Sequence, residues 1–122
     1  MSDDKSAIVV GGSLAGLFCA LILSRIGWRV RVYERDETYP AARHVPVPIM
    51  PELRMALQAA GAGDMRSLGV RTTGVRHLSA KGAIARESGE PRDMTDWSRL
   101  LGLLRAAAGE SDIRDGIRVT GA

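Results

Sequence analysis

The residues of this 122-residue chain that are best suited to chemistry form a small-residue turn near the N-terminus. The turn reads G-G-S-L-A-G over residues 11–16, close to the G-x-G-x-x-G fingerprint of dinucleotide-binding proteins. Gly11 is expected to make the tight turn, and Gly16 to let the following helix pack closely. Ser13 stands where the second glycine lets backbone approach a pyrophosphate, and its hydroxyl can itself donate to phosphate. The turn therefore predicts a site for a phosphate-bearing ligand.

An acidic residue, Glu34, follows this turn at the spacing of about 20 residues that the fingerprint requires. A carboxylate there accepts hydrogen bonds from a ribose 2′-hydroxyl and disfavours a 2′-phosphate, so NADP is not expected in this site. On the residues alone, NAD and FAD fit equally well. The alternative is a unit whose glycines serve packing only.

The elements that must position these residues form a βαβ unit. The apolar run 7–10 is long enough for one buried parallel strand. An apolar segment over 14–26 repeats at helical spacing, Gly27 ends it, and β-branched residues alternate over 29–33. A helix that starts directly after the turn presents free N–H groups and a positive dipole end to an anion. The predicted fold class is α/β, an incomplete Rossmann-like (FAD/NAD(P)-binding) βαβ domain with an added β-hairpin and helices.

The rest of the chain is predicted to add a loop, two helices, a hairpin and a strand. The loop, 36–50, contains three prolines, which force extended backbone. The elements after it are a helix over 51–60, a hairpin whose strands 75–79 and 83–86 flank Lys81-Gly82, a helix over 96–108 with Thr95 as N-cap, and a strand over 116–120.

Composition narrows the class of protein. The net charge is +3 and aromatic residues make up 4%, with arginines scattered singly, so no nucleic-acid partner is expected. The longest apolar run, 14–23, is too short to cross a bilayer, and no signal peptide begins as this chain does. The single cysteine, Cys19, allows no internal disulfide and is expected to be an inert core residue, which fits a cytoplasmic protein. No metal site is expected, because His77 has no ligand partners at suitable spacing, and no catalytic set can be singled out.

Four segments together resemble a known family. They read VVGGSLAGL, VYER, PEL at the start of a helix, and TDWSRLLGLLRAA. The chain is similar over about 8–120 to the N-terminal part of the FAD-dependent aromatic-ring monooxygenases (class A flavoprotein hydroxylases), in the subgroup like 2,6-dihydroxypyridine hydroxylase. The resemblance implies that residues 1–122 are the N-terminal portion of an FAD-binding domain, with no second domain present.

The resemblance also implies FAD as cofactor. The turn would hold the pyrophosphate through backbone groups, Glu34 the adenosine ribose, and Arg35 would sit beside the adenosine half. NAD(P)H and an electron-rich aromatic substrate would be used only in an enzyme completed by further chain. The cofactor-binding residues implied are Gly11, Gly12, Ser13, Leu14, Ala15, Gly16, Glu34, Arg35 and Arg43.

The sequence departs from the family in ways that leave other functions open. Side chains and prolines fill 42–48, where relatives have a glycine-rich stretch, and Trp97 stands where many have a cofactor-contacting arginine. Later family motifs are absent, so the chain is expected to be incomplete as an enzyme. One alternative is a non-catalytic nucleotide-fold module that self-associates or pairs with a partner chain. Another is an NAD-binding dehydrogenase fragment.

Overall fold

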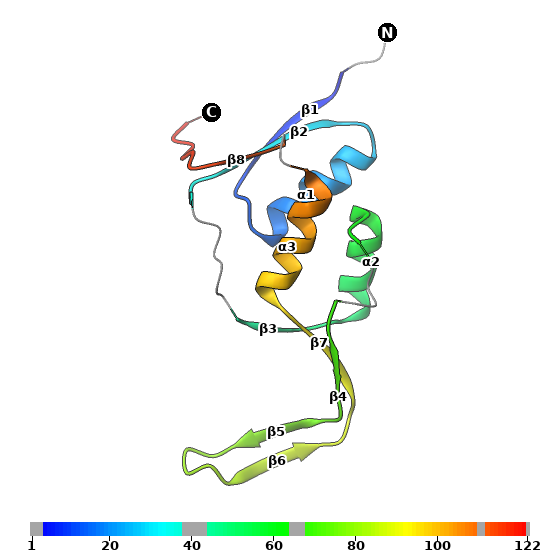
Figure 1. Cartoon of the computed structure of the whole chain (residues 1–122), viewed down its shortest axis with the longest axis vertical. Helices are drawn as coiled ribbons and strands as arrows, with labels where there is room; N and C mark the ends of the chain where they lie inside the picture. Colours follow the sequence, from blue (N-terminus) through cyan, green and yellow to red (C-terminus); the bar gives the residue numbers. More distant parts are fainter. Residues whose placement is uncertain (1–3, 38–43, 64–67, 110–111, 122) are drawn as a thin grey trace.

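A three-stranded parallel sheet organises the N-terminal part of the molecule (Figure 1). The computed structural model describes residues 4–37, 44–63, 68–109 and 112–121. The strands, in sheet order, are β1 (Ser6–Val10), β2 (Arg29–Glu34) and β8 (Ile113–Asp115). Helix α1, Leu14–Arg25, connects β1 to β2, and Gly27 with φ +92° turns the chain after it. The predicted βαβ unit is confirmed.

The parallel sheet is covered on one face only, within the described residues. Val30 and Val32 of β2 are buried and pack with Ala20 of α1. On the other face Ile8 and Val10 of β1 are 67% and 65% exposed. An almost continuous apolar run is typical of a parallel strand buried on both faces, so β1 shows more apolar surface than its neighbours cover.

Three helices build the main core. Helix α1 packs against α2 (Pro51–Ala60) and α3 (Trp97–Ala108), as Figure 1 shows. The helical repeat in each sequence turns its leucines to the shared interior. The buried residues of this cluster are Leu17, Leu21, Leu57, Ala60, Ala62, Leu68, Leu100, Leu101 and Leu104.

A second region contains only antiparallel pairs. The strands β3 (Pro46–Pro48), β7 (Arg92–Asp96) and β4 (Val70–Thr72) form a sheet in that order. The strands β5 (Val75–Leu78) and β6 (Ile84–Ser88) form the predicted hairpin, which projects away from the helices in Figure 1.

Two predicted elements are wrong in their details. The last strand is Ile113–Asp115 and not 116–120, because its three residues pair with β2, whereas 116–121 form no strand. The N-cap of α3 is Asp96 and not Thr95, since Asp96 Oδ1 accepts from the backbone N–H of Ser98 and Arg99. Thr95 is buried, and its hydroxyl instead donates to the carbonyl oxygen of Leu68.

One side chain predicted to lie in the core, that of Cys19, is exposed on the solvent side of α1. Met50 and Met55 are also mostly exposed, at 54% and 68%. Helix α1 is apolar on most of its surface, so periodicity alone does not say which side faces water. No helix in the described ranges is long and apolar enough to span a membrane.

Candidate functional site

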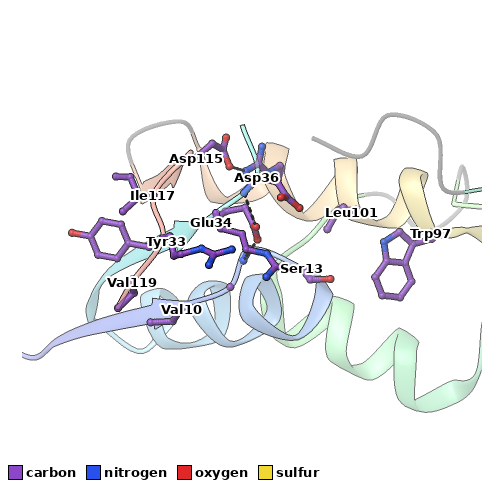
Figure 2. A pocket seen from close by; sticks show the side chains of 15 residues that line it. Val10, Ser13, Tyr33, Glu34, Asp36, Trp97, Leu101, Asp115, Ile117 and Val119 are labelled. Carbon is purple, nitrogen blue, oxygen red and sulfur yellow. Dashed lines mark hydrogen bonds and ion pairs between the residues drawn. The ribbon is translucent and has the colours of Figure 1, made fainter. Parts of the chain in front are cut away.

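The carboxyl ends of the three parallel strands border one cavity. Val10, Glu34 and Asp115 are the last residues of β1, β2 and β8, and all three line it. Ligands of open α/β sheets bind outside this end of the strands. The cavity has a volume of about 580 Å³ (Figure 2). Its lining residues are Val10, Gly11, Gly12, Ser13, Tyr33, Glu34, Arg35, Asp36, Trp97, Leu101, Arg105, Asp115, Ile117, Arg118 and Val119.

The glycine turn has the geometry that its sequence predicts. Gly11 has φ +106°, a conformation that favours glycine, and its N–H donates to the carbonyl oxygen of Tyr33 at 2.8 Å. A Cβ on Gly16 would overlap the Gly11 carbonyl and lie 3.3 Å from Cγ1 of Val9. The glycine at position 16 therefore lets α1 start directly against the turn.

The N-terminus of α1 is open to the cavity at Ser13. Ser13 is the N-cap, and its carbonyl oxygen accepts from the Leu17 N–H at 3.0 Å. Its side chain makes no capping hydrogen bond and is exposed. The first turn contains no acidic residue. This helix end thus has a positive dipole and a free hydroxyl, which together suit an anion.

Glu34 is held by backbone groups on two sides. Its Oε2 accepts from the Gly12 N–H at 2.7 Å, and its Oε1 from the Asp36 N–H at 3.1 Å. Partial burial by itself raises the pKa of Glu34, and nearby Asp115 also raises it. Hydrogen bonds from the N–H groups of Asp36, Gly12 and Arg35 outweigh both, so the pKa lies below its ordinary value of 4.5. Glu34 is therefore an anion at neutral pH.

The sequence did not reveal that the carboxylate of Asp115 lies at the cavity. Asp115 is the register partner of Glu34 on the neighbouring strand, and the guanidinium of Arg105 on α3 forms an ion pair with it. Just after β8, the Ile117 N–H donates to the Glu34 carbonyl oxygen at 2.9 Å, so the chain beyond Asp115 stays beside the end of β2. Correct placement of β8 was the signal that could have found Asp115, since it would have put an acid at a third strand end.

The two ends of the cavity are apolar and lie on opposite sides of Glu34. Figure 2 shows Val10, Tyr33, Ile117 and Val119 gathered on one side, with Trp97 on the other. A long ligand would match this arrangement if its anionic middle lay at the N-terminus of α1 and a flat apolar group lay at its end.

The structure brings most of the predicted site residues together. The cavity lining includes Gly11, Gly12, Ser13, Glu34 and Arg35. Leu14, Ala15 and Gly16 form the first turn of α1 directly behind it. Arg43 lies outside the described residues. No group of three or more potential metal ligands occurs in the part of the chain that the structure describes.

Comparisons with known proteins extend the resemblance. No family model matches the chain. Kynurenine 3-monooxygenase from Xanthomonas axonopodis pv. citri (strain 306) is 38% identical over 67 residues, which are 51% of this chain and 15% of that enzyme. The enzyme of the same name from Stenotrophomonas maltophilia (strain K279a) is 35% identical over 65 residues, 49% of this chain and 14% of the enzyme. The matches thus span about one-seventh of these relatives.

Solved structures match over nearly the whole chain. The 2,6-dihydroxypyridine-3-hydroxylase from Arthrobacter nicotinovorans has a TM-score of 0.77 and 26% identity, covering 94% of this chain and 29% of that one. Klebsiella pneumoniae HpxO, solved with FAD and uric acid, also has a TM-score of 0.77 at 20% identity, covering 99% and 33%. At 20% identity, the match to HpxO shows that the fold is similar and nothing more. Together the comparisons confirm the α/β fold and the resemblance to FAD-dependent aromatic hydroxylases, over part of their length.

Proposed function

We propose that this chain carries the ADP-binding part of an FAD site in a flavin-dependent monooxygenase. The observation that carries the proposal is the Gly12–Glu34 hydrogen bond beside the N-terminus of α1, inside the cavity at the strand ends. The bond joins the glycine turn to the Glu34 carboxylate, and this supports the proposal because a dinucleotide site needs an anion-binding turn beside a ribose-binding acid.

The diphosphate fits the start of α1. The backbone N–H groups of Ser13, Leu14 and Ala15 would donate to phosphate oxygens, with the Ser13 hydroxyl beside them. No carboxylate in the first turn opposes an anion there. Arg43 remains our proposal for a further phosphate contact.

The adenosine half fits the other side of the turn. The Glu34 carboxylate accepts from a ribose 2′-hydroxyl and repels a 2′-phosphate. The apolar group of Tyr33, Ile117 and Val119 offers a surface for a flat ring, and Arg35 is also among the residues that line the cavity. The extended remainder of FAD would run toward Trp97.

The chemistry of the proposed enzyme belongs mainly to the cofactor. Bound FAD supplies electron transfer and oxygen activation, and the residues of this chain bind and orient its nucleotide end. Hydroxylation of an aromatic substrate with NAD(P)H and O2 is proposed for an enzyme that includes more chain than these 122 residues. Residues 1–122 are proposed to be the N-terminal portion of its FAD-binding domain.

Thermal unfolding with separate ligands tests this function. FAD and ADP should each raise the melting temperature, because a ligand at 100 times its Kd stabilises the native state by about 2.7 kcal/mol. NADP should not raise it, because of Glu34. A larger increase with NAD than with FAD would favour the dehydrogenase alternative. No increase with FAD or ADP would overturn the proposal.

A second candidate function is supported by the open face of β1. Ile8 and Val10 are mostly exposed, although their strand has the sequence of one covered on both faces. A module that pairs with itself or with a partner chain would cover them. Light scattering after size-exclusion chromatography tests self-association, which predicts a dimer mass that added FAD leaves unchanged. A monomer at all concentrations would contradict self-association.

A further inference from the structure

The outer edge of β1 is open to a further strand. β1 lies at one margin of the parallel sheet, and among the described residues it pairs with β2 alone. Folded proteins ordinarily protect such an edge with charged side chains, proline or a bulge. Ser6–Val10 contains no charged residue and no proline, and its pairing with β2 has no register shift. This edge is therefore able to accept another strand.

Helix α1 presents an apolar stripe to solvent. Ala15 and Cys19 are exposed, and Ile26 is 67% exposed. With the partly buried Ile22 they follow one another at steps of four, three and four residues, the spacing of a helix face that packs against another helix. A helix that is apolar on all sides is typical of a buried position. The stripe is thus a surface suited to a neighbouring helix.

The stripe borders the open edge of β1. Leu17 and Leu21 of α1 pack in the core cluster with α2 and α3, and the helical repeat places the stripe on the other side of α1. Helix α3 in turn lies toward the far margin of the sheet, since the Arg105–Asp115 ion pair joins α3 to β8. The uncovered side of α1 therefore faces the β1 margin, and one partner can contact both the edge and the stripe.

The charge of this surface indicates which partner fits it. Residues 6–24 contain no charged side chain, although 25% of the chain is charged. An acidic or basic partner would find no opposite charge there. A second copy of the chain brings the same uncharged edge and stripe, so no like charges meet, and a two-fold axis makes such a surface complementary to itself.

We propose that two copies of the chain pair through β1 around a two-fold axis perpendicular to the sheet, with their α1 helices packed side by side. The inference rests on self-association, the second candidate function above, and names its surface. The two β1 strands run antiparallel and join the two sheets into one. Ile8, the middle residue of β1, lies at the axis. The pairing does not require a bound nucleotide.

Cys19 lies close to the same axis. Val9 is level with Gly16, because a Cβ on Gly16 would lie 3.3 Å from Cγ1 of Val9. A strand advances about 3.3 Å per residue and a helix about 1.5 Å, so Ile8 is level with the turn of α1 that contains Cys19. An axis through Ile8 therefore brings Cys19 of the two copies face to face.

Oxidation of the wild-type chain with diamide, followed by non-reducing gel electrophoresis, tests this arrangement. The chain has one cysteine, so a covalent dimer can form only between two Cys19 thiols, and diamide takes up the two electrons and two protons that they release. The wild type should cross-link. Cys19→Ser/Met55→Cys moves the thiol to a position on α2 that is 68% exposed, and should cross-link about tenfold more slowly, because its thiols are not held together.

Light scattering of two lysine variants tests the strand edge. Ile8 is 67% exposed, so Ile8→Lys should fold, and it places like charges opposite each other at the axis. We expect it to weaken the dimer by about tenfold. Met55→Lys adds the same charge on α2 and should leave the dimer mass unchanged.

The outcomes separate this inference from self-association and from nucleotide binding. A wild-type dimer that does not cross-link through Cys19, or whose mass Ile8→Lys leaves unchanged, overturns this interface and leaves self-association intact. A wild-type monomer overturns both. The cross-linking comparison needs no variant of β1 to fold. The thermal shift with FAD or ADP tests nucleotide binding separately, and its result bears on neither.

Discussion

The backbone N–H of Gly12 donates a 2.7 Å hydrogen bond to Oε2 of Glu34, 22 residues further along the chain. The bond joins the turn after β1 to the end of β2. A Cβ on Gly12 would lie 3.0 Å from Cβ of Glu34 and 3.2 Å from Oε2, so the contact leaves little room for a side chain. The turn and the acid therefore fix each other in position, and the site is preorganised for a ligand.

The Gly12–Glu34 contact predicts a pH-dependent part of the stability. The pKa of Glu34 is lowered on folding, so its contribution is present above the unfolded pKa, ordinarily 4.5, and is lost as the pH falls through the lower folded pKa. We expect wild type to exceed Glu34→Gln in free energy of unfolding at neutral pH, with a difference that shrinks below pH 4.5.

Urea unfolding of both proteins over a pH series measures this difference. Glu37→Gln is a suitable control, because Glu37 is exposed and should show no such trend. A wild-type advantage that stays constant from neutral to acidic pH would show that the charge of Glu34 does not stabilise the turn.

Gly16→Ala should disrupt the start of α1. A Cβ at this position overlaps the carbonyl of Gly11, which is backbone and cannot easily move, so we expect a loss of about 2–4 kcal/mol. Gly102→Ala in α3 is the control, since a Cβ there meets nothing within 4 Å and alanine favours helix by about 1 kcal/mol. The melting temperature should thus fall in Gly16→Ala and rise in Gly102→Ala. Equal shifts in the two variants would contradict the close packing at the start of α1.

Thr95→Val should cost more stability than Thr72→Val. Both hydroxyls donate to a backbone carbonyl, that of Leu68 for Thr95 and that of Arg92 for Thr72. Thr95 is buried at 7% exposure, so removal of its hydroxyl leaves the Leu68 carbonyl without this donor and away from water. We expect the free energy of unfolding to fall by about 1–3 kcal/mol. The exposed bond of Thr72 should cost under about 0.5 kcal/mol. Chemical unfolding of the two variants measures both losses of stability. A larger loss in Thr72→Val would contradict the greater contribution expected of the buried Thr95 hydrogen bond.

Asp96→Ala should destabilise α3 by about 1 kcal/mol, because it removes the cap of the Ser98 and Arg99 N–H groups. Asp96→Asn should retain most of the stability, since asparagine caps almost equally well. Asp96 Oδ2 also lies 3.3 Å from Nδ1 of His44, so His44→Ala measures that exposed contact separately. A large loss in His44→Ala would show that the contact with His44, and not the cap, is what stabilises this end.

Local patterns in the sequence were enough to predict the βαβ unit and the glycine turn. An apolar run, a helical repeat, Gly27 and alternating β-branched residues act over a few neighbouring positions, so β1, α1 and β2 lie where they were expected. Helix α2 and the hairpin follow from equally local signals, Pro51 and Lys81-Gly82. The pairing of the turn with Glu34 also followed, because the spacing of the fingerprint places both at the same edge of a parallel sheet.

Only the tertiary structure determined the elements that depend on pairing between segments far apart in the sequence. The short strands β3, β4 and β8 have three residues each, too few to show a period, and they exist because a partner strand lies beside them. The same reason brings Asp115 to Arg105 and into the cavity. The exposure of Cys19 was decided by which side of an almost wholly apolar α1 met α2, α3 and the sheet. Sequence thus determined the elements with local signals, and the packing of those elements determined which further residues reach the site.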